Sequence, residues 1–158
     1  MSEPPAEILR RVRPIPTYTN KPTTKPHDIA GVDPAGRACA LQVEEATAPV
    51  LLLFLSAGCL GCRDLWEGLG ELHAGLGDAC RVAVVTKSPG DEDPATIARL
   101  AGAATAESQI GLVMSTPAYR DYGVGGPPFL VVAKGGSVVT EGVAWGVDET
   151  LRVALDAL

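Results

Sequence analysis

Runs of aliphatic residues separated by turn-forming residues predict the order of strands and helices in this chain. The longest run, residues 50–55, is apolar at every position and is followed by Ser56, Ala57 and Gly58. A continuous apolar run of strand length is typical of a central strand covered on both faces. Leucines then recur at helical spacing, at Leu65, Leu69, Leu72 and Leu76. The pattern therefore predicts a buried strand that leads into a helix through residues 59–62.

The second half of the chain continues this alternation. Residues 82–86 predict a second strand, residues 95–104 a helix, residues 112–114 a short strand and residues 117–122 a helical turn. Residues 129–133 and 137–141 predict a hairpin around a Lys-Gly-Gly turn, and a C-terminal helix follows. Alternating helices and strands of this kind predict an α/β fold, with a mixed sheet and helices on both faces.

The N-terminal part has a different pattern. Residues 1–28 are rich in Pro, Thr, Lys and Arg and have no usable periodicity, which predicts a flexible tail or linker. Residues 29–43 are interrupted by Gly31, Pro34 and Gly36 and predict a short hairpin at the edge of the domain. The expected organisation is a tail over residues 1–28 and one domain over residues 29–158.

Composition and charge narrow the classes of function. The 158 residues, 46% of them hydrophobic, suit a single globular domain that does not need its four cysteines for stability. A net charge of −6 disfavours binding to nucleic acid or to anionic lipid. No apolar run is long enough to cross a bilayer, and none near Met1 resembles a signal peptide. As written, the chain is expected to be cytoplasmic; it would be extracytoplasmic if an N-terminal anchor had been removed.

The candidate chemistry lies in Cys59 and Cys62, at the predicted junction of strand and helix. Backbone N–H groups and the positive end of the helix dipole favour a thiolate at Cys59, which makes it the expected nucleophile. Cys62, one turn later and more shielded, is the expected resolving thiol. The thiolate of Cys59 would attack a disulfide, and Cys62 would then displace the mixed disulfide. The same steps in reverse would oxidise a dithiol.

Three other roles for cysteines are a zinc site, core packing and a second disulfide. A CxxC pair can be half of a zinc site, but Cys39, Cys80, His27 and His73 are isolated in the sequence and supply no second ligand pair, so no metal is expected. Cys39 and Cys80 are most simply core residues. A second disulfide between them is an open alternative at this stage, and it would imply an oxidising compartment.

Residues 50–62, together with residues 122–132 and 134–137, resemble the thioredoxin superfamily. The segment Tyr-Gly-Val-Gly-Gly-Pro-Pro at residues 122–128 is similar to the family's Tyr-Gly-(aliphatic)-x-Gly-x-Pro block, which lies beside the dithiol and contains a cis proline, here Pro128. The long spacing between the blocks and the strand region at residues 29–43 resemble the TlpA, ResA and MauD-like subgroup, whose domains are thiol-disulfide oxidoreductases often anchored outside the cytoplasmic membrane. The resemblance covers residues 29–158.

This resemblance implies a three-layer α/β/α fold with a mixed central sheet and an N-terminal strand extension. It implies that Cys59 and Cys62 are catalytic and that Gly126, Pro127 and Pro128 contact the substrate. The implied partner is a protein disulfide or dithiol, and no metal or organic cofactor is implied.

Several positions depart from the family pattern. Leu60-Gly61 replaces the Gly-Pro between the cysteines, which leaves the reduction potential and the direction of electron flow open. Gly58 replaces the Trp that usually precedes the first cysteine, and Leu53 replaces a buried Asp that accepts the proton of the resolving cysteine. Deprotonation of Cys62 must then depend on water or on another carboxylate, and Asp64 and Glu67 are the nearest candidates in the sequence, although both also suit the solvated face of the helix.

Pro127 is a further departure. The residue before the cis proline offers its backbone N–H and C=O to an extended substrate in this family, and proline has no N–H. One hypothesis is that docking is altered and favours a narrow set of partners; the alternative is that the Pro-Pro pair only stiffens a turn.

Two other functions compete with disulfide exchange. Residues 56–59, Ser-Ala-Gly-Cys, resemble the Thr/Ser-x-x-Cys of peroxiredoxins, although Leu52 stands where that family has a Pro, so a thiol peroxidase is one alternative. A non-catalytic adaptor that uses the fold as an interaction surface is the other.

Overall fold

The computed structural model describes residues 25–107 and 109–158. Residues 1–24, most of the predicted tail, lie outside this part of the chain. The strands are β1 (Ile29–Val32), β2 (Ala38–Leu41), β3 (Val50–Phe54), β4 (Arg81–Thr86), β5 (Gly111–Met114), β6 (Phe129–Lys134) and β7 (Ser137–Val143). The helices are α2 (Arg63–Glu67), α3 (Leu69–Leu76), α4 (Pro94–Glu107), α5 (Thr116–Asp121) and α6 (Val147–Ala157), with short 3₁₀ turns η1 (Leu60–Cys62) and η2 (Gly77–Ala79).

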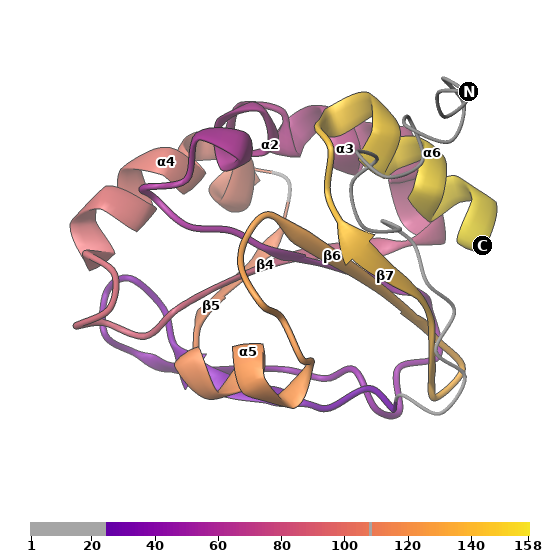
Figure 1. Ribbon diagram of the computed structural model, residues 1–158, viewed down its shortest axis with the longest axis horizontal. Helices are drawn as coiled ribbons and strands as arrows, with labels where there is room; N and C mark the ends of the chain where they lie inside the picture. Colours follow the sequence, from indigo (N-terminus) through magenta and orange to yellow (C-terminus); the bar gives the residue numbers. More distant parts are fainter. Residues whose placement is uncertain (1–24, 108) are drawn as a thin grey trace, which may run out of the picture.

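The strands form one mixed sheet in the order β2-β1-β5-β4-β3-β6-β7. β3, β4 and β5 are parallel, whereas β6 runs antiparallel to β3 and β7 antiparallel to β6. Helices α2, α3, α4 and α6 cover one face of this sheet, and α5 lies under the other (Figure 1). This arrangement confirms the predicted α/β fold with its three layers.

Strand β3 supplies both halves of the core. Leu51, Leu53 and Leu55 pack among the residues of the four-helix layer, and Val50, Leu52 and Phe54 pack on the side of α5. All five residues of β3 are fully buried. The continuous apolar run is therefore explained by a strand that has no solvent face, as the sequence predicted.

The predicted edge hairpin is also confirmed. β1 and β2 pair antiparallel with Ile29 opposite Leu41, and β1 joins the sheet through Val32 opposite Met114. An added Cβ at Gly31 would lie 2.2 Å from the Met114 carbonyl oxygen, so a larger residue there would separate these strands. The hairpin thus extends the sheet beyond β5 as the N-terminal strand extension.

The segment before the hairpin is held by hydrogen bonds at two residues, Asp28 and His27. The Asp28 carboxylate accepts hydrogen bonds from the backbone N–H groups of Val43 (2.7 Å) and Glu44 (2.9 Å). The backbone N–H of His27 donates to the Tyr122 hydroxyl at 2.8 Å, and that hydroxyl donates back to the His27 carbonyl oxygen. Residues 27 and 28 are therefore bonded to the domain itself.

The helix after Cys62 is broken, although the leucine spacing predicts a continuous one. α2 ends and α3 begins at Gly68, whose φ and ψ are −100° and 12°. An added Cβ at Gly68 would lie only 2.2 Å from Cγ2 of Val147, the first residue of α6. The break lets α6 pack closely on this helix, and nothing in the leucine pattern indicates a contact 79 residues further along the chain.

Candidate active site

Cys59 lies beyond the carboxyl end of β3, where it caps the 3₁₀ turn η1 with extended backbone angles of −95° and 119°. The backbone N–H of Cys62 donates to the Cys59 carbonyl oxygen at 3.2 Å and closes this turn. α2 follows at once. The two cysteines therefore lie where the sequence predicted them, at the point where the buried strand is followed by a helix.

Two aromatic side chains hold the backbone just before Cys59. The indole Nε1 of Trp66 donates to the Ser56 carbonyl oxygen at 3.1 Å, and the Tyr119 hydroxyl donates to the Leu55 carbonyl oxygen at 3.0 Å. Trp66 comes from α2 and Tyr119 from α5, so the strand end is fixed from both faces of the sheet. The position of Cys59 is thereby tied to the core rather than to a free loop.

The two thiols have different surroundings. Cys62 is fully buried, whereas Cys59 is half-buried. The side chain of Cys59 makes no hydrogen bond to the N–H groups of the turn it caps, although the sequence predicts that its sulfur faces them. Its Sγ lies instead 3.6 Å from the carbonyl oxygen of Pro127. The sulfur exposed at the surface thus contacts the proline loop.

Burial raises the pKa of the Cys62 thiol to about 12. Burial is the largest cause of this rise; a hydrogen bond with Cys59 and the negative charges of Cys59 and Glu92 contribute to it, and a hydrogen bond from the backbone at Ser56 opposes it. Cys62 therefore holds its proton at neutral pH and needs a proton acceptor to act as a nucleophile.

The loop before β6 completes the site. The Pro127–Pro128 peptide bond is cis, as the family resemblance implies. The ring of Pro128 packs over the dithiol turn, because an added Cβ at Gly61 would lie 3.3 Å from its Cδ. The Pro128 carbonyl oxygen accepts a hydrogen bond from the Ala144 N–H at 3.2 Å. Cys59, Cys62, Pro127 and Pro128 are thus brought together from distant parts of the chain.

Two surface hollows flank this loop and the dithiol. One, of about 370 Å³, lies beside Cys59, and we call it the Cys59 hollow; its lining includes Gly58, Leu60, Arg63, Trp66, Glu67, Arg99 and Leu100. The other, of about 270 Å³, is lined by Gly126 together with Lys87, Tyr119 and Arg120. Gly126 therefore faces the α5 side of the site.

Neither carboxylate proposed from the sequence is bonded to Cys62. Asp64 is exposed, and its Oδ2 accepts a hydrogen bond from the backbone N–H of Val147 at 2.9 Å. It therefore holds the start of α6 against α2. Glu67 is also exposed and lines the Cys59 hollow.

Glu92, in the loop between β4 and α4, is a carboxylate that lies beside the backbone leading to Cys59. Its side chain is half-buried, and Oε2 lies 3.4 Å from the backbone nitrogen of Ala57, two residues before Cys59. Its negative charge raises the pKa of both Cys62 and Tyr119. Sequence analysis missed Glu92, because it stands in an acidic turn whose residues all suit solvent.

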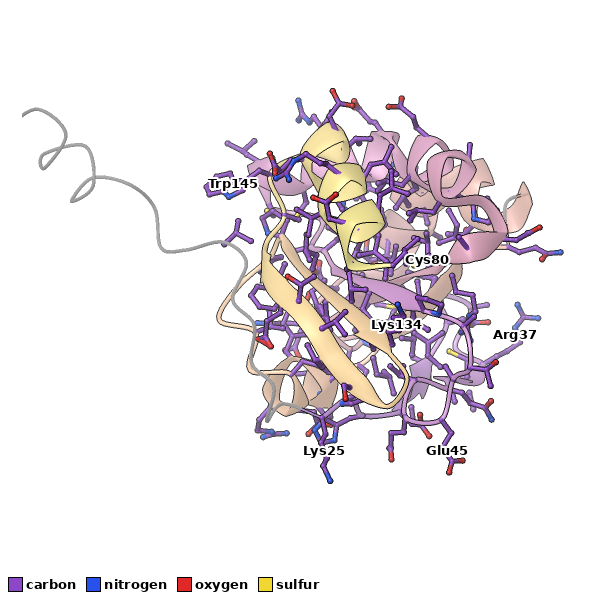
Figure 2. All side chains as sticks on the ribbon, turned by 90° about the vertical axis from the view of Figure 1, so that its right-hand side faces the viewer. Lys25, Arg37, Glu45, Cys80, Lys134 and Trp145 are labelled. Atoms are coloured by element: carbon purple, nitrogen blue, oxygen red, sulfur yellow. The ribbon has the colours of Figure 1, made fainter. Side chains whose placement is uncertain are left out.

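Cys39 and Cys80 lie away from this site and from each other. Cys39 packs against the core on the α5 side, where its Sγ lies 3.8 Å from the Leu112 carbonyl oxygen. Cys80 is 1% exposed and belongs to the core under the four helices (Figure 2). Because the sheet separates them, both are free thiols and the open question of a second disulfide is answered.

Residues 25–107 and 109–158 contain no group of three or more His, Cys, Asp and Glu side chains arranged to hold a metal ion. None of their helices has the length and apolar character that a membrane span requires.

No protein-family model matches the sequence, and no curated protein matches it. Solved structures match in fold. The thioredoxin domain of a thiol-disulfide oxidoreductase from Bacteroides vulgatus superposes with a TM-score of 0.64 at 19% identity, over 87% of this chain and 98% of that one. A DsbF homologue from Corynebacterium diphtheriae gives 0.65 at 17% identity, over 90% and 94% of the two chains.

A third similar structure is a peroxiredoxin-like protein from Aquifex aeolicus, with a TM-score of 0.64 at 13% identity over 87% of this chain and 86% of that one. At such identities the likeness concerns the fold. The chain has a thioredoxin-like fold, which confirms the fold implied by the resemblance.

Proposed function

We propose that this thioredoxin-fold chain is a thiol-disulfide oxidoreductase that exchanges its Cys59–Cys62 pair with a protein partner. The observation that carries the proposal is the unequal thiol pair: within one turn, a half-buried sulfur lies against the cis-proline loop and a fully buried sulfur lies behind it. The first can be reached by another protein, and the second can react only with the first.

The reaction balances in two displacements. The Cys59 thiolate attacks one sulfur of the partner disulfide, a bond forms between Cys59 and the partner, and the other partner sulfur leaves as a thiolate that takes up a proton. Cys62 then loses its proton and attacks Cys59, which releases the second partner thiol. Two electrons pass to the partner, and Cys59 and Cys62 end as a disulfide; the reverse sequence oxidises a partner dithiol.

Glu92 is the proposed acceptor of the Cys62 proton, in preference to Asp64 and Glu67. Three observations support it: its charge acts on Cys62, its side chain is half-buried at the strand end that leads to Cys59, and Asp64 is occupied with α6. Glu92 would thus take the role of the buried Asp of the family pattern, which is Leu53 in this chain.

The test equilibrates the protein against defined ratios of reduced and oxidised glutathione and follows Cys59 and Cys62 by alkylation and mass spectrometry. The expected result is a reversible two-electron transition that links Cys59 to Cys62 and yields a reduction potential. A pair that stays reduced at every ratio would overturn the proposal.

The competing functions give different results with the same protein. A thiol peroxidase would consume hydrogen peroxide faster than it exchanges protein disulfides, and the peroxiredoxin-like neighbour makes this control necessary. A non-catalytic adaptor would show neither activity.

A further inference from the structure

The Cys59 hollow is open on the side of the reactive sulfur. Gly58 leaves its rim uncovered, since an added Cβ there would meet no atom within 4 Å. Leu60, the next residue after Cys59, is 85% exposed, the highest value among the large hydrophobic side chains of the described residues. Leu100 of α4, which is partly buried against the core, lines the same hollow, so the apolar surface next to the site of attack comes mainly from Leu60.

Two cationic side chains line the same hollow. Arg63 comes from α2 and Arg99 from α4, and both side chains are exposed. Neither guanidinium makes a hydrogen bond or a close ion pair with any residue from 25 to 107 or from 109 to 158; Arg99 only lowers the pKa of Asp93 through its charge. Glu67 supplies the opposing charge in the hollow. Among the residues that line the hollow, these two cations outnumber the one carboxylate, in a chain whose net charge is −6. Glu92 is not one of the lining residues, although its Oε2 lies 3.4 Å from the nitrogen of Ala57, which is one.

The backbone of the proline loop offers little to a bound segment. Pro127 has no N–H, its carbonyl oxygen lies 3.6 Å from Cys59 Sγ, and the Pro128 carbonyl oxygen is bonded to Ala144. An extended partner segment would therefore lack the donor needed for strand-like pairing at this point. Recognition must depend more on side chains, and the hollow presents them beside Cys59.

We infer that the Cys59 hollow binds the partner segment that carries the reactive cysteine, and that this segment has an acidic residue and an apolar residue next to that cysteine. The inference rests on the proposed function and names its substrate class. The partner's carboxylate would pair with Arg63 and Arg99, and its apolar side chain would cover Leu60.

Short peptides with blocked termini test this directly. Each contains one cysteine in a disulfide with a 2-pyridylthio group. This group leaves as neutral 2-thiopyridone, and its release is followed by absorbance. Leu flanks the cysteine on one side, and Glu, Gln or Lys on the other, in both orders. We expect the reduced protein to react in the order Glu, Gln, Lys, with about a fivefold to tenfold difference between the extremes at low salt and a smaller one at high salt.

Charge reversal in the hollow should change this order. Arg63→Glu and Arg99→Glu are expected to react faster with the Lys peptide than with the Glu peptide. Arg81→Glu is the matched control, because Arg81 is an exposed arginine at the amino end of β4, the opposite end of the sheet from the dithiol. It should keep the wild-type order, and circular dichroism should show that all three variants are folded.

The outcomes separate this inference from the proposed function. Equal rates for the three peptides, or an unchanged order in Arg63→Glu and Arg99→Glu, would overturn the inference and leave disulfide exchange standing. Faster reaction with the 2-pyridyl disulfide of glutathione than with the Glu peptide would overturn it in favour of a small anionic thiol. No reaction with any peptide would overturn the proposed function and the inference with it.

Discussion

The region of the dithiol differs from the packed core regions that hold the other two cysteines in what surrounds the sulfur. Cys59 and Cys62 share one turn at the carboxyl end of β3, where one thiol reaches the surface and the other lies behind it. Cys39 and Cys80 are single thiols packed into opposite faces of the sheet. The comparison teaches that reactivity here depends on a second sulfur within reach and on a path to solvent, since all four side chains are chemically the same.

Removing the exposed sulfur should break this comparison most completely. We expect Cys59→Ser to lose at least about a thousandfold in the rate of disulfide exchange. The other partly exposed thiol, Cys39, has its pKa raised by burial and by the charge of Asp33, and it has no second sulfur in its turn to complete the exchange. The rate is measured as the release of a chromophore from a peptide disulfide. Cys39→Ser is the matched control and should exchange like the wild type; an equal loss in both variants would contradict the distinction between the two regions.

Alkylation of the native protein should show the same contrast. Cys59 is expected to react with iodoacetamide at least about a hundredfold faster than Cys80, because Cys80 is 1% exposed and burial raises its pKa to about 11. Mass spectrometry of peptides taken at successive times gives both rates. In denaturant the two rates should converge, and comparable rates in the native protein would mean that Cys80 is not part of the core.

Glu92→Gln separates the two effects of this residue on the dithiol. Loss of the negative charge should lower the pKa of Cys62, which by itself would speed its attack on the mixed disulfide at neutral pH. Loss of a proton acceptor would instead slow that step, and we expect the net result to be about a tenfold decrease. Stopped-flow resolution of a preformed Cys59 mixed disulfide across a pH range measures it.

Glu67→Gln is the control for this measurement, because Glu67 is an exposed carboxylate at the end of α2, the helix that follows Cys62. It should leave the rate of resolution unchanged. Faster resolution in Glu92→Gln would assign Glu92 an electrostatic role only and would remove it as the proton acceptor.

The smallest expected effect concerns the contribution of Cys80, in the core under the four helices, to the stability of the protein. The raised pKa of Cys80 means that the folded protein keeps a proton there which the unfolded chain releases above about pH 9. Its contribution to the free energy of unfolding is therefore fully present below pH 9 and is lost as the pH rises towards 11. Cys80→Ala should cost about 1 kcal/mol at neutral pH.

The same variant should then lose less stability than the wild type between these pH values. Urea unfolding at several pH values measures the difference. Parallel pH curves for the two proteins would show that ionisation of Cys80 is not linked to unfolding.

The elements that the sequence predicted correctly are those whose signal is local. The apolar run of β3 shows its burial directly, and the Gly135–Gly136 turn, with φ of 59° and 80°, can be recognised from two adjacent glycines. The dithiol and the Pro128 loop were recognised as two short motifs, and the fold brings them together as the family resemblance implied.

The features that could not be predicted depend on contacts between distant segments. Gly68 breaks a helix because Val147 packs on it, and Asp64 accepts a hydrogen bond from the first residue of α6. Glu92 reaches the site because the loop after β4 folds back to Ala57. In each case the residue type suits a solvated position, so only the tertiary structure distinguishes it from its neighbours.

The bond between Asp64 and Val147 has a practical consequence for work with this protein. It joins α2, the helix that directly follows the dithiol, to the C-terminal helix α6 across 83 residues, so a displacement of α6 is passed on to α2. Truncation within α6, or a fusion that pulls on it, would disturb the first helical turn after Cys62. Affinity tags and surface attachment are therefore better placed before residue 25 than after Leu158.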